Sequence, residues 1–203
     1  GAGTGGVLLL QSTPKPWQEG VSAQWSMGSF QSKNQYINAR AGTEQFQNTF
    51  SLQNQESNGY RDQSALKRTV LSWDLSSTLT EKSKLESHFL YGDLFYETPG
   101  GLTATELLTS PRSARPRTGP VPGAEEARAA ISQKNFFSGI RYQYALNTNW
   151  TESASLYGAF IRLRNPGIFN YSWANEAHTG GRYVLAYQKN QLSLQFGTEI
   201  QQG

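Results

Sequence analysis

The sequence predicts an all-β protein, an antiparallel meander of strands that forms part of a large transmembrane β-barrel. Apolar and polar residues alternate with a period of two along most of the 203 residues, which is the pattern of strands. Short turns alternate with longer polar loops, as in outer-membrane barrels, where turns lie on one side of the membrane and long loops on the other. Many segments are also longer than strands in soluble sheets, which usually have about five or six residues.

About nine segments show the alternation. At 69–79, Leu71 and Trp73 share one side of the strand, and Ser72 and Asp74 share the other. The predicted strands span residues 18–30, 35–41, 44–53, 69–79, 84–96, 136–146, 153–164, 182–189 and 191–200. We expect short turns at 41–43, 80–83, 147–149 and 189–190, and longer connections at 54–68, 98–135 and 165–181.

One segment has the composition of a helix. Residues 122–131 combine several alanines with Glu125 and Glu126 near the start, where negative charge suits the helix dipole, and with Arg128 further on. The sequence therefore predicts a helix inside the longest connection, which also contains five of the eight prolines.

Composition excludes several functional classes. Aromatic residues reach 12%, which is too many for a disordered chain. The net charge of +3 is too small for a nucleic-acid-binding surface. The sequence has no cysteine, and His88 and His178 lie on separate segments without a second ligand at metal-binding spacing. We expect no enzymatic activity, no cofactor, no metal site and no nucleic-acid partner.

Alternation alone does not distinguish a barrel from a soluble β-sandwich, in which the apolar side of each strand faces a core. In that alternative the chain would be a carbohydrate-binding module that stacks sugars on Trp25, Trp73 and Trp173. The segregated loops, the strand lengths and the aromatic residues near strand ends favour the barrel.

Arginines are the candidate ligand-binding residues. Their guanidinium groups bind carboxylates and phosphates through two parallel hydrogen bonds, so a group of them predicts a basic entrance for an anionic ligand. We expect Arg162 on the polar side of its strand, opposite Tyr157 and Ile161. Solvated surface arginines that contact lipopolysaccharide are the alternative. The six candidates lie in the longest connection or near the loop ends of strands: Arg112, Arg115, Arg117, Arg162, Arg164 and Arg182.

Four motifs in sequence resemble TonB-dependent outer-membrane receptors, in particular the branch that takes up ferric citrate and related siderophores. They are GAGTGGVLLL at 1–10, GSF at 28–30, ESNGYR at 56–61 and LFYETPGGLT at 94–103. The resemblance implies that residues 1–16 are the C-terminal end of a plug domain and that residues 17–203 are the N-terminal portion of a β-barrel.

The resemblance also implies a function without covalent chemistry. Such a receptor lies in the outer membrane of a Gram-negative cell, contacts its lipid, and binds a ferric siderophore or ferric citrate outside the cell. The TonB energy-transducing complex drives uptake through the plug. Since barrels of this type have about 22 strands, we expect the 203 residues to be a fragment of a longer receptor that does not transport on its own.

Overall fold

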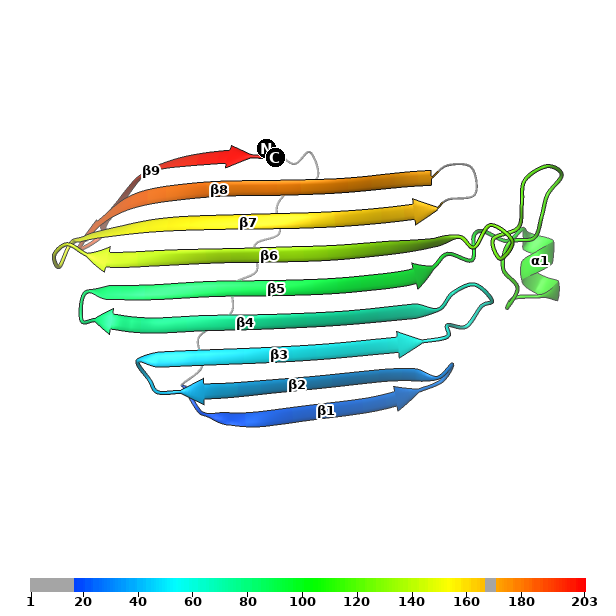
Figure 1. The fold of residues 1–203 in the computed structure, drawn as a ribbon, viewed down its shortest axis with the longest axis horizontal. Coiled ribbons are helices and arrows are strands. Elements are labelled where there is room, and N and C mark those ends of the chain that lie inside the picture. Colours follow the sequence, from blue (N-terminus) through cyan, green and yellow to red (C-terminus); the bar gives the residue numbers. More distant parts are fainter. Residues whose placement is uncertain (1–16, 167–170) are drawn as a thin grey trace.

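Nine strands form one sheet in which each strand pairs antiparallel with the next along the chain (Figure 1). The computed structural model describes residues 17–166 and 171–203. The predicted all-β meander is confirmed. The strands are β1 (Gly20–Gly28), β2 (Ser32–Gly42), β3 (Phe46–Ser57), β4 (Leu66–Thr80), β5 (Ser83–Glu97), β6 (Ala130–Ala145), β7 (Trp150–Pro166), β8 (Tyr171–Lys189) and β9 (Leu192–Gln202).

Most strands are longer than the sequence pattern predicts, although β1 is shorter. The expected connection at 165–181 is wrong, because β7 continues to Pro166 and β8 begins at Tyr171. Small and polar residues occupy both sides of this part of β8, so its alternation is weak. Backbone pairing with β7, such as Leu163 opposite Ala174, makes the segment a strand. In the same way the loop between β3 and β4 shrinks to residues 58–65.

The helix prediction is also wrong. Residues 124–128 form turns, and the helix α1 lies earlier in the same loop, at Ala104–Thr109. A capping box begins α1, with the Thr103 hydroxyl accepting from the Glu106 backbone N–H and the Glu106 carboxylate accepting in return. Ala124 and Ala129 are buried inside the loop, so their packing overrides their helix propensity. No helix in the described residues is long and apolar enough to cross a membrane.

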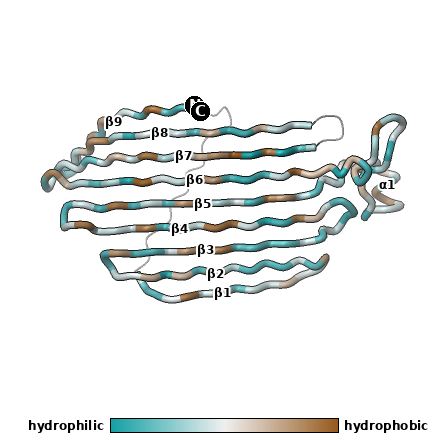
Figure 2. Tube along the Cα trace, in the orientation of Figure 1, coloured by the Kyte–Doolittle hydropathy of each residue, from teal (hydrophilic) through white to brown (hydrophobic). Residues whose placement is uncertain are grey.

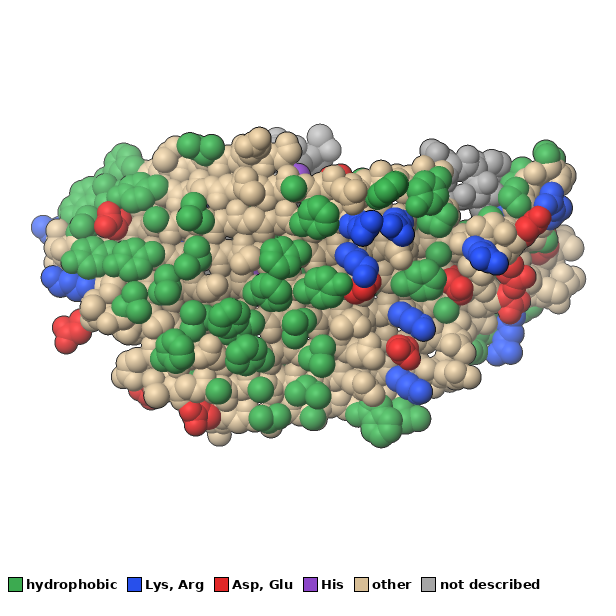
Figure 3. Space-filling view, in the orientation of Figure 1, with side chains coloured by type: hydrophobic (Ala, Val, Ile, Leu, Met, Phe, Trp, Pro, Cys, Tyr) green, Lys and Arg blue, Asp and Glu red, His purple; other side chains and the backbone are tan. Residues whose placement is uncertain are grey.

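The two faces of the sheet differ in chemistry. Because the strands pair in register, side chains of one parity line one face, which we call the apolar face. Figure 2 shows hydrophobic and hydrophilic positions mixed along each strand, and Figure 3 shows the hydrophobic side chains of this face. The polar face is opposite and carries residues such as Asp74, His88 and Arg141. Apolar-face residues include Val21, Trp25, Phe50, Leu71, Trp73, Phe136, Phe160 and Phe196.

No part of the described chain covers the apolar face. Trp25 is 65% exposed and Ile200 is 76% exposed. In the described part of the chain the buried hydrophobic residues are four alanines, at 114, 124, 129 and 130. A soluble sandwich would bury this face against a second sheet, and the described residues form a single sheet. The arrangement therefore does not favour the carbohydrate-binding alternative.

Strand β7 corrects the predicted orientation of one segment. Phe136 of β6 pairs with Phe160, which places Phe160 and Arg162 on the apolar face. Tyr157 and Ile161 then lie on the polar face, opposite to the expectation. Apolar residues occur at both odd and even positions of β7, so its sequence alone does not show which positions lie on the apolar face. The pairing with β6 and β8 decides this.

Adjacent substitutions on β4 test the two faces. Leu75 lies level with Ile140, in the middle of the apolar band, so Leu75→Lys places a charge on the apolar face, and Ser76→Lys places it on the polar face. In the full-length protein we expect Leu75→Lys to lower the free energy of unfolding in lipid vesicles by about 2–4 kcal/mol and Ser76→Lys to have little effect. Guanidinium titration of the heat-modifiable folded form measures both. Equal losses would contradict an outward apolar face.

Candidate functional site

The two longest described connections and one short link lie at the same end of the sheet, on the right in Figure 1. They connect β1 to β2 (29–31), β3 to β4 (58–65) and β5 to β6 (98–129). The connection at 167–170 lies outside the described residues. Turns at the opposite end contain two to four residues. The predicted long loops are therefore present at 58–65 and 98–129, whereas the connection 29–31 is as short as a turn.

Arg61 joins two of these loops. Its Nε and Nη2 donate hydrogen bonds of 3.0 and 2.9 Å to the carbonyl oxygen of Ser113, and Nη1 donates one of 2.8 Å to the carbonyl of Gly100. The backbone N–H of Asp62 also donates to the carbonyl of Arg112 at 2.7 Å. Loop 58–65 is therefore fixed against loop 98–129. Arg61 was not among the predicted arginines, although it lies in the ESNGYR motif.

Arg112 brings a third loop into contact. Its guanidinium lies 5.6 Å from the ring centroid of Phe30 and 5.4 Å from that of Tyr60. The two rings meet edge to face at 5.5 Å. No ion pair within the described residues engages this guanidinium. Arg112 is thus positioned by cation–π contacts while its hydrogen-bonding groups remain available to a ligand.

Arg115 and Arg117 stabilise the loop itself. The Arg115 side chain donates to the carbonyl oxygen of Pro122 and packs against Gly100, where φ is +72° and a Cβ would come 2.9 Å from that of Arg115. Arg117 forms a two-point ion pair with Glu126. This hydrogen-bonded pair holds the pKa of Glu126 below its usual range. Both guanidinium groups already form hydrogen bonds within the loop, so neither presents two free parallel donors to an anionic ligand, as the sequence prediction requires.

The remaining predicted arginines lie on opposite faces. Arg182 is on the polar face, between Ser155 of β7 and Glu199 of β9. Arg162 and Arg164 are on the apolar face, and the Arg164 guanidinium lies 5.7 Å from the Trp173 ring centroid. The structure therefore brings Arg112, Arg115 and Arg117 into one loop but does not join them with Arg162 and Arg164.

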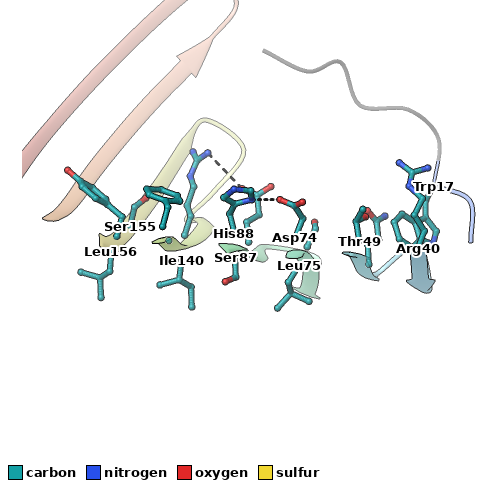
Figure 4. Close-up of a pocket in the computed structure, with 17 residues that line it drawn as sticks. Trp17, Arg40, Thr49, Asp74, Leu75, Ser87, His88, Ile140, Ser155 and Leu156 are labelled. Atoms are coloured by element: carbon teal, nitrogen blue, oxygen red, sulfur yellow. Dashed lines mark hydrogen bonds and ion pairs between the residues drawn. The ribbon is translucent and has the colours of Figure 1, made fainter. Parts of the chain in front are cut away.

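A charged trough of about 650 Å³ runs across the polar face (Figure 4). His88 and Asp74 form a hydrogen-bonded pair near its middle, and both point to the same side of the sheet in Figure 4. Glu86 lies between Lys84, at 2.6 Å, and Arg141, at 3.9 Å. The sequence prediction missed this group as a unit, because its members come from three strands. In the described residues no three potential ligands come together to hold a metal ion.

Comparison with known proteins identifies the fold. No family model matches the sequence. The ferric-catecholate import receptor Fiu from E. coli K12 superposes in its closed form with a TM-score of 0.67 at 11% identity, over 91% of this chain and 31% of that chain. Its open form gives 0.59 at 11% identity, over 94% and 35%. The ferric citrate transporter FecA in its unliganded form gives 0.67 at 12% identity, over 89% and 27%.

These comparisons support the architecture. The chain spans about a third of the length of each receptor chain. Its nine strands form an open sheet in which β1 and β9 have no further partner among the described strands. The fold is therefore part of a large transmembrane β-barrel, as the sequence predicts. At 11–12% identity the similarity concerns the fold alone.

Removal of the Arg61 side chain tests the connection between the loops. Because Arg61→Ala loses three hydrogen bonds from a charged donor, each of about 1.5–3 kcal/mol, we expect trypsin to cleave loop 98–129 of the folded full-length protein at least about tenfold faster. Arg68→Ala, on the polar face of β4, is the matched control. Similar cleavage rates in the two variants would mean that Arg61 does not hold the loop.

The loop should also loosen in acid. The Arg117 hydrogen bond lowers the pKa of Glu126, and hydrogen bonds from Thr103 lower the pKa of Glu106. A lowered pKa stabilises the folded loop above the usual carboxylate range, and this stabilisation is lost as the pH falls through the folded pKa. Hydrogen exchange in 98–129, corrected for intrinsic rates, should rise at acidic pH. A Glu106→Gln/Glu126→Gln variant should lose most of that pH dependence, and an unchanged dependence would contradict this explanation.

Proposed function

We propose that this chain is the end of the plug and the first nine strands of the barrel of a TonB-dependent outer-membrane receptor. The observation that carries the proposal is the exposed apolar face of the sheet, which nothing in the described chain covers. The fold similarity to an import receptor for ferric catecholates and to a ferric citrate transporter supports the same reading. In this assignment residues 1–16 end the plug, and residues 17–203 begin the barrel.

The ligand in this proposal is a ferric siderophore or ferric citrate, bound at the loop end. Such chelates carry negative charge and present carboxylate or catecholate oxygens, which a guanidinium binds well. Arg112 is the best-placed contact, because the Phe30 and Tyr60 rings orient it and no carboxylate within the described residues neutralises it. Arg182 is not assigned to this ligand, because it lies on the polar face eleven residues along β8 from the loop end at Tyr171, or about 36 Å at ~3.3 Å per residue. Arg115 and Arg117 act indirectly by holding the loop.

Transport in this proposal needs no bond to be made or broken. The barrel wall supplies the lumen, and the charged trough around His88 and Asp74 is the surface that a plug would contact. The TonB complex would then pull on the plug to release the chelate into the periplasm. The protein is proposed to be a receptor and transporter, without enzymatic activity.

Binding of ferric chelates tests this function. In the full-length receptor we expect Arg112→Ala to weaken the affinity for ferric citrate, or for a ferric tricatecholate, by about tenfold or more, because it removes a charged hydrogen-bond donor. Arg162→Ala removes the same charge from the apolar face and should leave the affinity unchanged. Equilibrium binding of ⁵⁵Fe-labelled chelates measures both. Wild-type protein that binds neither chelate would refute the receptor assignment, and unchanged affinity in Arg112→Ala would remove its role.

A further inference from the structure

Charged side chains cross the apolar face near the loop end (Figure 3). Strand pairing sets them side by side: Lys33 opposite Glu56, Glu56 opposite Lys67, Asp93 opposite Lys134, and Lys134 opposite Arg162. Arg164 lies two residues beyond Arg162 on β7. We call this set the basic row, and its members are Lys33, Glu56, Lys67, Asp93, Lys134, Arg162 and Arg164.

The basic row marks one boundary of the apolar band. On β6 the apolar-face residues from Tyr144 to Phe136 are eight residue steps apart, or about 26 Å at ~3.3 Å per step, and Lys134 comes next. On β7, Phe160 is followed on the same face by Arg162. This length is comparable to the apolar band of about 25 Å on outer-membrane barrels. The cations therefore lie at the depth where lipid headgroups begin.

The row carries an excess of positive charge. It has five cations and two carboxylates, and all five cations are exposed. Lys134 pairs with Asp93 at 3.0 Å, whereas Lys67, Arg162 and Arg164 form no ion pair with any described residue. Such a surface is complementary to an anion.

One pair within the row has more positive charge than its neighbouring carboxylate, Asp93, can neutralise. Lys134 and Arg162 are directly opposite each other on neighbouring strands, and like charges in that position destabilise a sheet. Arg164 adds a third cation next to them, oriented by its contact with Trp173. A phosphate held between these side chains would convert the repulsion into charge-assisted hydrogen bonds.

We propose that the basic row binds the phosphorylated sugar headgroup of lipopolysaccharide, whose acyl chains then lie on the apolar face. The proposal rests on the outer-membrane placement proposed above, in which the loop end faces the outer leaflet. Lys67 on β4 and Arg164 on β7 are three strand spacings apart, about 14 Å. One phosphate does not span that width, whereas a headgroup with phosphates at both ends of a disaccharide suits it. Arg162 and Arg164 are thus assigned to lipid instead of the imported ligand.

Binding of purified lipid A to the full-length receptor in detergent tests the assignment. The variant Lys67→Gln/Arg162→Gln/Arg164→Gln removes three charges from the row. The control Arg68→Gln/Lys84→Gln/Arg141→Gln removes three from the polar face. Native mass spectrometry should give an apparent Kd for bisphosphorylated lipid A that is about tenfold or more weaker in the row variant and unchanged in the control. Equal Kd values in all three proteins would overturn the proposal.

Lipid chemistry separates the remaining outcomes. Dephosphorylated lipid A should bind wild-type protein as weakly as the row variant binds lipid A, and tight binding of it would overturn the role of phosphate. Phosphatidylglycerol binding as tightly as lipid A would make the occupant a glycerophospholipid and overturn the assignment to lipopolysaccharide. If the glutamine variant does not fold, Arg162→Gln and Arg164→Gln singly, with Arg→Lys at both as the charge-retaining control, give the same comparison. Lipid A binding without ferric-chelate binding would uphold this inference and refute the proposed function.

Discussion

The apolar face of the sheet depends on a hydrocarbon environment. Water near this face would contact Trp25, Phe50, Phe196 and their neighbours, and each fully exposed side chain of this size forgoes about 1.5–3 kcal/mol of hydrophobic stabilisation. Since the buried hydrophobic residues of the described chain are alanines, the fold does not obtain this energy from an internal core. Lipid on one side and a hydrated lumen on the other supply the environment that both faces need.

The same environment constrains the backbone. In a membrane every N–H and C=O group must be paired within the protein, so strands cross it only as closed barrels. The long ladders between β4 and β8 satisfy this requirement across the middle of the sheet, but among the described strands β1 and β9 each have one edge without a partner. Further strands of the same kind would complete the ladder, which agrees with the share of the import receptors that this chain covers.

At the loop end, side chains replace strand pairing as the source of order. Arg61, Arg112 and the Arg117–Glu126 pair connect three loops through hydrogen bonds, ring contacts and charge. These contacts leave Arg112 in an ordered yet unneutralised position, which suits an anion-binding residue. Arginine holds loops in this chain, and our proposals assign other arginines to a ligand and to the lipid boundary.

The amino-acid sequence by itself determined the strand number, the meander and the chemistry of most faces, because a period of two needs only local information. It did not determine where β8 begins. It also did not determine the orientation of β7, where apolar residues occur on both parities and the partner strands decide. It also did not determine which arginines share a site. Arg162 and Arg182 have the same chemistry, but strand pairing places Arg162 on the apolar face and Arg182 on the polar face. Only the tertiary structure decides this, because a shift of one residue in the pairing moves every side chain of a strand to the other face.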